Sequence, residues 1–181
     1  TTGASSFGAT VNLRTLGNTS SLKPFGEVSN SFGSFNTIKN TVRFGTGLMD
    51  RKWNFEGGLS NIQSDGFIDR AKSDLKSYYL SGSYLGKNSS IQALVFSGHE
   101  KTYQAWYGAP IRLLSSGIDS NQTYNPYDYD NEIDNYQQTH YQLHITNKGI
   151  KNLKLNTSFH YTRGKGYFEQ YVGTGHNSVM Y

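Results

Sequence analysis

Apolar and polar residues alternate along much of this chain, and this alternation constrains its fold more than any other feature. Between residues 53 and 60, for example, Trp53, Phe55 and Leu59 share one parity and polar residues occupy most of the other. A period of two is the signature of a β-strand with one apolar face. With a first strand near 22–32, we expect about seven strands in an antiparallel meander, the others falling in segments 38–48, 53–60, 78–84, 91–96, 141–145 and 153–161.

The composition also favours an all-β fold. Aromatic residues make up 14% of the 181 residues and charged residues only 17%, while the helix formers Ala and Glu are scarce. Many aromatic residues and a small net charge argue against intrinsic disorder. The longest apolar run, 93–96, is far shorter than the ~18 residues of a transmembrane helix. The strands of a membrane barrel, however, alternate and carry a much weaker hydropathy signal.

The connections between the expected strands alternate in length after the first hairpin. Segments 49–52, 86–89 and 147–150 are short and polar, whereas 64–74 and 103–135 are long. Alternate connections of a meander lie at the same end of the sheet, so one end should carry tight turns and the other long loops. This asymmetry, with strands of roughly 10–15 residues, is typical of outer-membrane barrels. A soluble secreted β-sandwich that binds glycans is the alternative, because its strands alternate in the same way.

Charge and cysteine content narrow the possible functions. The net charge is +4, but the 17 Lys and Arg residues are scattered, so we expect no nucleic-acid partner. The chain has no cysteine, which excludes disulfides, thiol chemistry and cysteine zinc sites. Neither a G-x-S-x-G elbow nor a phosphate-binding loop is present. We therefore expect no enzyme, no catalytic residue and no cofactor, with a β-structured hydrolase as a third hypothesis.

The long connection between 103 and 135 concentrates aromatic residues. Tyr and Trp offer ring area with a polar group, so this loop is a candidate ligand-binding surface. Alternatively, its rings pack within the loop or form an interfacial aromatic belt. The candidate residues are Tyr103, Trp106, Tyr107, Tyr124, Tyr127 and Tyr129.

Acidic residues in the same region, and histidines after it, raise the question of metal binding. Asp128, Asp130, Glu132 and Asp134 supply oxygens suited to calcium, but the spacing lacks the central Gly of an EF-hand. We interpret them as a solvated acidic loop. His140 and His144 share one parity, and His160 falls on the polar parity of the next strand. A register that places His140 opposite His160 could create a metal site, but we expect a polar wall and no metal.

Several segments, in order, resemble TonB-dependent outer-membrane receptors. The run GASSFGATVNL at 3–13 is similar to the closing strand of their plug domain, and 27–37, with the tip GSFNT, looks like their first barrel hairpin. The segments SDGFIDR at 64–70, GHEKTYQAW at 98–106 and DNYQQTHY at 134–141 look like receptors of this family from Bacteroidetes-type bacteria.

The resemblance implies a two-part organisation and an uptake function. Residues 1–20 would be the C-terminal end of the plug, and 21–181 the N-terminal part of a 22-stranded barrel in the bacterial outer membrane. The sequence lacks the TonB box and most of the plug that the family would have, so we expect it to be a fragment. The expected function is energised uptake of a scarce nutrient, such as an iron–siderophore complex. The expected partners are outer-membrane lipid, the plug and remaining strands, the TonB complex through a segment not present here, and the small-molecule or metal-complex ligand.

The polar parity would then form the barrel wall that faces the plug. Charge on the lipid face of a barrel costs about 2–4 kcal/mol at mid-membrane, so charged residues within the strands should face inward. The residues expected to face the plug are Lys39, Arg43, Glu56, His140, His144 and His160.

Overall fold

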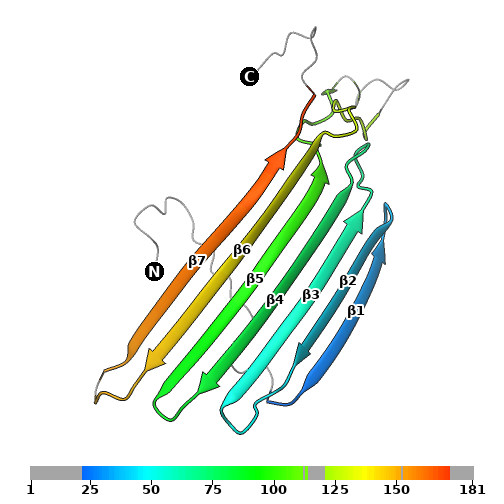
Figure 1. The fold of residues 1–181 in the computed structure, drawn as a ribbon. Coiled ribbons are helices and arrows are strands. Elements are labelled where there is room, and N and C mark those ends of the chain that lie inside the picture. The colour runs from blue at the N-terminus through cyan, green and yellow to red at the C-terminus, as the bar shows by residue number, and fades with distance from the viewer. Residues whose placement is uncertain (1–21, 112, 114–120, 152, 172–181) are drawn as a thin grey trace.

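The computed structural model describes residues 22–111, 113, 121–151 and 153–171. They form one seven-stranded antiparallel sheet in which each strand pairs with the next along the chain (Figure 1). The expected all-β meander is thus confirmed. The expected plug segment, 1–20, lies outside the described residues. The strands are β1 (Phe25–Gly33), β2 (Thr37–Gly45), β3 (Trp53–Ser64), β4 (Ser73–Leu85), β5 (Ser89–Tyr103), β6 (Ile133–Asn147) and β7 (Leu155–Phe168).

The connections fall at two ends of the sheet. We call the end with 46–52, 86–88 and 148–154 the turn end, and the end with 34–36, 65–72 and 104–132 the loop end. The expected alternation of short and long connections is only partly present, because 46–52 is nearly as long as 65–72. The last strand also begins at Leu155 rather than near residue 153. The asymmetry between the ends therefore depends mainly on 104–132.

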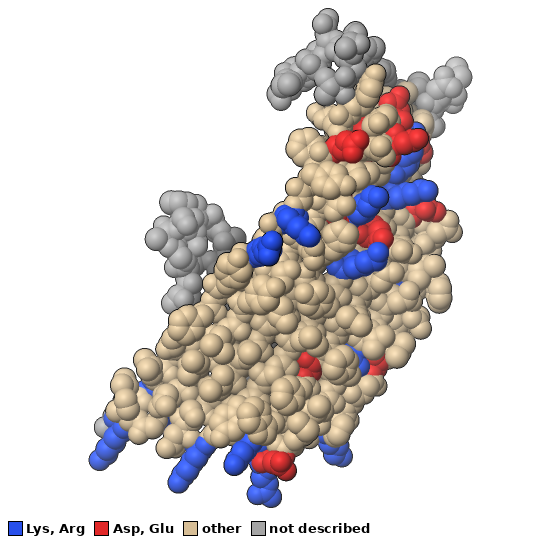
Figure 2. Space-filling model, in the orientation of Figure 1, with Lys and Arg blue, Asp and Glu red and all other residues tan. Residues whose placement is uncertain are grey.

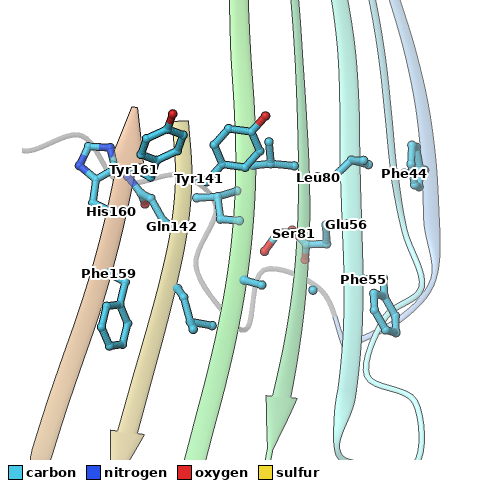
Figure 3. A pocket seen from close by; sticks show the side chains of 15 residues that line it. Phe44, Phe55, Glu56, Leu80, Ser81, Tyr141, Gln142, Phe159, His160 and Tyr161 are labelled. Carbon is cyan, nitrogen blue, oxygen red and sulfur yellow. The ribbon is translucent and has the colours of Figure 1, made fainter. Parts of the chain in front are cut away.

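The pairing register gives the sheet one apolar face. Across the middle of the sheet, Phe44 pairs with Gly57, Gly57 with Leu80, Leu80 with Val95, Val95 with Tyr141, and Tyr141 with Tyr161. Residues that pair project to the same side, so this row shares one face. Figure 3 shows Phe44, Leu80, Tyr141 and Tyr161 in this row, with Phe55 and Phe159 in the next row toward the turn end.

These rows make up an apolar band on one face of the sheet. Over most of β2 to β7, the band consists of Ile38, Val42, Phe44, Trp53, Phe55, Leu59, Tyr78, Leu80, Tyr84, Ile91, Ala93, Val95, Tyr141, Leu143, Ile145, Leu155, Phe159 and Tyr161. Charged residues gather at the turn end and toward the loop end, and the region between them is largely uncharged (Figure 2).

The described residues build almost no hydrophobic core. Only Leu94 and Tyr127 are buried among their hydrophobic side chains, whereas Leu80 is 50% exposed and Phe159 59% exposed. Monomeric soluble proteins rarely expose a continuous apolar surface of this extent. The apolar band therefore requires a covering layer beyond the described residues. No helix in the described part of the chain is long and apolar enough to cross a membrane.

The apolar band runs obliquely to the hydrogen-bonded rows. Toward the loop end, the band ends at Ile38 in β2 and at Tyr161 in β7. The row of Ile38, however, reaches β7 at Tyr167, six residues beyond Tyr161. Toward the turn end, the band ends at Phe44 in β2 and at Leu155 in β7. The row of Phe44 reaches β7 at Tyr161, so Leu155 again lies six residues away from that row, on its turn side. Within β2 a single polar residue, at position 40, interrupts the band.

Candidate functional site

Two loops at the loop end are joined through the side chain of Arg70. The guanidinium of Arg70 donates from Nε to the carbonyl oxygen of Tyr127 at 2.9 Å and from Nη2 to that of Asn125 at 2.9 Å. Asn125, which is 3% exposed, donates from Nδ2 to the carbonyls of Asp69 and Gln104, both at 2.9 Å. The connections 65–72 and 104–132 are therefore held together by hydrogen bonds between distant parts of the sequence.

Gln104 anchors the start of the long loop to the sheet. Its side chain is fully buried and donates from Nε2 to the carbonyl of Glu169 at 2.9 Å. Its backbone N–H donates to the carbonyl of Glu132 at 2.8 Å. Both bonds reach residues at the ends of β6 and β7, so the base of the loop is fixed to three strands.

Three of the six predicted aromatic residues form a cluster on this base. The ring of Tyr127, 5% exposed, stacks on Tyr107 with centroids 5.6 Å apart. Trp106 approaches the Tyr127 ring edge-on at 6.2 Å and Phe168 at 6.0 Å. Trp106 and Tyr107 remain 56% and 65% exposed. We call Trp106, Tyr107 and Tyr127 the aromatic cluster, with Tyr127 as its buried support.

The other three predicted aromatic residues lie apart from the cluster. The hydroxyl of Tyr103 donates to the carbonyl of Tyr129 at 2.7 Å, which ties the end of β5 to the loop. Tyr129 packs against Tyr171 with centroids 5.4 Å apart. Tyr124 is half-buried within the loop. The loop thus packs on itself and also presents the exposed rings of Trp106 and Tyr107.

Burial changes the acid–base behaviour of Tyr127. Desolvation raises the pKa of its hydroxyl, and neighbouring Tyr107 and Glu132 raise it further. Because the pKa rises from an ordinary value of 10.0, Tyr127 is protonated and neutral at physiological pH. Tyr127 therefore brings no charge to the aromatic cluster.

The acidic residues of the loop are dispersed. Asp128 and Asp130 are exposed, whereas Glu132 is buried and its Oε2 accepts from the N–H of Tyr129 at 3.2 Å. Asp134 belongs to β6 and lies on the polar face. Among the described residues, no group of three His, Cys, Asp or Glu side chains is arranged to hold a metal ion.

The charged residues predicted to face the plug lie on the polar face. Lys39, Arg43 and Glu56 alternate with the apolar band along β2 and β3. Arg43 Nη1 forms an exposed ion pair with Glu27 Oε2 at 3.2 Å. Glu56 is 6% exposed near the middle of the sheet, and Figure 3 shows it close to Ser81 of the neighbouring strand.

The register that would place His140 directly opposite His160 is not the one the structure has. His140 pairs with Thr162, and His160 pairs with Gln142. The two imidazoles still meet diagonally on the polar face, with His140 Nδ1 3.1 Å from His160 Nε2. The Thr162 hydroxyl lies 3.0 and 2.9 Å from these two nitrogens.

His144 stands outside this pair. Its Nδ1 lies 2.9 Å from the Ser158 hydroxyl, and its Nε2 lies 3.3 Å from Gln142 Oε1. The three histidines thus share a face without converging on one point, and hydrogen bonds to neighbouring polar groups account for each of them.

Sequence patterns did not single out the residues that fix the loop base. Arg70, Gln104 and Asn125 act through carbonyls more than twenty positions away. Arg70 also adopts a φ of 64°, which is uncommon for a residue other than glycine. Nothing in the sequence around Arg70, Gln104 or Asn125 predicts these contacts, because the contacts depend on where the two loops lie in the folded protein.

Comparisons with protein-family models, curated proteins and solved structures found no match for this chain. Function is therefore inferred from the residues and their geometry. Two surfaces stand out: the apolar band, which needs a covering layer, and the exposed part of the aromatic cluster beyond it.

Proposed function

We propose that this chain is part of a transmembrane β-barrel in the bacterial outer membrane, and that the barrel is a TonB-dependent receptor for an iron complex or a similarly scarce nutrient. In this proposal the apolar band contacts lipid and the polar face contacts the plug. The turn end lies in the periplasm and the loop end outside the cell, following the usual arrangement of such barrels.

The exposed apolar band is the observation that carries the membrane part of the proposal. A soluble β-sandwich would cover this face with a second sheet and bury its large residues, but the described residues form one sheet, in which Leu59, Leu80 and Phe159 are all at least half exposed. Few charged residues lie along the middle of the sheet (Figure 2), and a surface in contact with the hydrocarbon layer requires this.

The obliqueness of the band supports closure into a barrel. Averaged over the five steps from β2 to β7, the band drops six residues, four of them between β2 and β3, and this mean drop corresponds to a strand tilt of roughly 40°, with about 3.3 Å per residue and 4.8 Å between strands. Closed barrels require strands tilted by about 35–45°. If the band lies parallel to the membrane, the strands therefore tilt by the amount that a closed barrel requires.

The uptake part of the proposal depends on the family resemblance and on the loop end. The resemblance supplies the energised mechanism, with TonB acting through a segment outside this chain. The aromatic cluster supplies a neutral, partly exposed ring surface on a hydrogen-bonded base, which suits capture of an aromatic or metal-chelating ligand. The chain itself would contribute one part of the ligand-binding surface.

A pair of adjacent substitutions tests the membrane part. Leu80→Arg places a charge on the apolar band, whereas Ser81→Arg places it on the polar face one residue away. We expect Leu80→Arg to destabilise the folded protein by about 2–4 kcal/mol and Ser81→Arg by much less. Urea unfolding in lipid vesicles measures the difference. Equal effects, or a monodisperse protein without detergent, would contradict the proposal and favour the sandwich.

A second pair of variants tests the ligand surface. Trp106→Ala with Tyr107→Ala removes the exposed rings of the cluster, and Trp53→Ala with Tyr84→Ala removes a comparable pair, 4.7 Å apart, at the turn end. We expect the first pair to weaken binding of ferric catecholate or hydroxamate complexes by roughly tenfold. The second should leave binding unchanged. Fluorescence titration measures both, and a panel in which no iron complex binds would contradict the assigned ligand class.

A further inference from the structure

Positively charged residues line the loop side of the apolar band. We call Lys76, Lys101, Arg163 and Lys165 the basic strip. Lys76 and Lys165 lie in one hydrogen-bonded row, which also passes through His99 and Gln137. The register puts all four cations on the same face as the band, and three strand steps, roughly 14 Å, separate Lys76 from Lys165.

The basic strip is nearly uncompensated. Lys76 Nζ pairs with Asp74 Oδ2 at 3.0 Å, and the Lys76 side chain is still 57% exposed. For Lys101, Arg163 and Lys165, no carboxylate partner occurs among the described residues. Four cations against one carboxylate leave a net positive surface beside an uncharged one.

The strip adjoins the band directly in β4 and β7, whereas Lys101 stands six residues beyond Val95 along β5. Lys76 stands two residues from Tyr78 along β4, and Arg163 stands two residues from Tyr161 along β7, so each cation shares a face with an apolar neighbour. Long basic side chains place their charges at a membrane surface while their stems cover apolar groups. A molecule with acyl chains and a negatively charged headgroup matches both parts of this surface.

We propose that the basic strip binds the phosphate groups of a multiply acylated lipid in the outer leaflet, with its acyl chains lying on the adjoining band. This proposal rests on the membrane placement proposed above. The span of the strip accommodates a headgroup with more than one phosphate, because separate cations can meet separate anionic groups. Charge complementarity and the continuity of strip and band favour a lipid over a soluble anion.

Lipid retention in nanodiscs tests the site. The protein is placed in phosphatidylcholine nanodiscs with a minor fraction of diphosphoryl lipid A, and the lipid A retained per protein is measured by native mass spectrometry. The test variant carries K76Q, K101Q, R163Q and K165Q. The control carries R51Q, K52Q, K87Q and K148Q, which remove the same charge at the turn end.

We expect the test variant to retain roughly tenfold less lipid A than the unchanged protein, and the control to retain the same amount. Replacing the three lysines of the strip by arginine should preserve retention, which separates charge from folding. Dephosphorylated lipid A should not be retained, and inorganic phosphate should not compete at concentrations that leave the bilayer intact.

The outcomes separate this inference from the proposed function. Equal loss in test and control variants, or equal retention of dephosphorylated lipid, would overturn the lipid site alone. Full competition by inorganic phosphate would assign the strip to soluble anions and overturn the lipid as its occupant. If the unchanged protein fails to enter nanodiscs of any composition, the membrane placement fails and the lipid site fails with it.

Discussion

At the residue scale, single polar side chains organise the loop end. Arg70 reaches two carbonyls more than fifty positions away, and Asn125 joins both loops from within. Hydrogen bonds from charged donors contribute more than neutral ones, about 1.5–3 kcal/mol each. Loss of Arg70 also leaves carbonyl oxygens without their donor, so its effect should extend along the loop that presents Trp106.

Arg70→Ala should loosen this loop without unfolding the sheet. We expect the free energy of local opening to fall by about 2 kcal/mol around Asp69 and Glu132, whose amides are hydrogen-bonded within the loop base. Hydrogen–deuterium exchange measures it. Arg51→Ala is the matched control, because Arg51 also has a positive φ, 55°, but lies at the turn end. Unchanged exchange at Asp69 in the Arg70 variant would contradict the role of the guanidinium.

At the element scale, the turn between β2 and β3 holds the chain that enters β1. Gly47 has a φ of 67°, and a Cβ there would lie 2.5 Å from the carbonyl carbon of Lys23 and 2.7 Å from the nitrogen of Pro24. The backbone N–H of Leu48 donates to the carbonyl of Leu22 at 3.3 Å. Only a residue without a side chain permits this approach.

Gly47→Ala should therefore destabilise the sheet at its β1 edge. We expect a loss of at least about 1 kcal/mol, because the substitution combines an unfavourable backbone conformation with a backbone clash. Thermal denaturation in detergent, monitored by circular dichroism, measures this loss of stability. Gly98→Ala, where a Cβ would meet nothing within 4 Å, should be neutral. Similar melting temperatures for both variants would show that the contact does not stabilise the sheet.

At the scale of the whole molecule, the oblique band connects register to membrane orientation. Ile38 and Tyr167 share a hydrogen-bonded row, but Ile38 and Tyr161 share the loop-side limit of the band. Under the proposed function, the band rather than the row lies parallel to the membrane. Residues in one hydrogen-bonded row should consequently lie at different depths in the membrane. Residues along the loop-side limit of the band should lie at the same depth.

Spin labels measure this directly, because the chain contains no native cysteine. We expect Ile38→Cys and Tyr161→Cys labels to lie at equal depth in a bilayer, and a Tyr167→Cys label to lie about 15 Å farther out. Electron paramagnetic resonance with lipid-soluble and water-soluble relaxants reports the depths. Equal depth at positions 38 and 167, with 161 about 20 Å deeper, would mean upright strands and contradict a tilted barrel wall.

The sequence alone determined the strands and their faces. A period of two is a local property, since neighbouring side chains on a strand must point to opposite sides. Trp53, Phe55 and Leu59 could therefore be assigned to one face from the sequence. The all-β meander could be predicted in the same way. The aromatic content of the 103–135 loop was equally visible, because composition does not depend on how the chain folds.

Only the tertiary structure decided which distant residues meet. The register between β6 and β7 placed His140 opposite Thr162 rather than His160, because the alternation within each strand does not fix the offset between two strands. The contacts of Arg70 and Gln104 likewise follow from where two loops lie on the sheet. The alternating pattern identifies each strand's apolar side, but the slope of the apolar band emerges only when the strands are paired, because the offset between neighbours is a property of the pair.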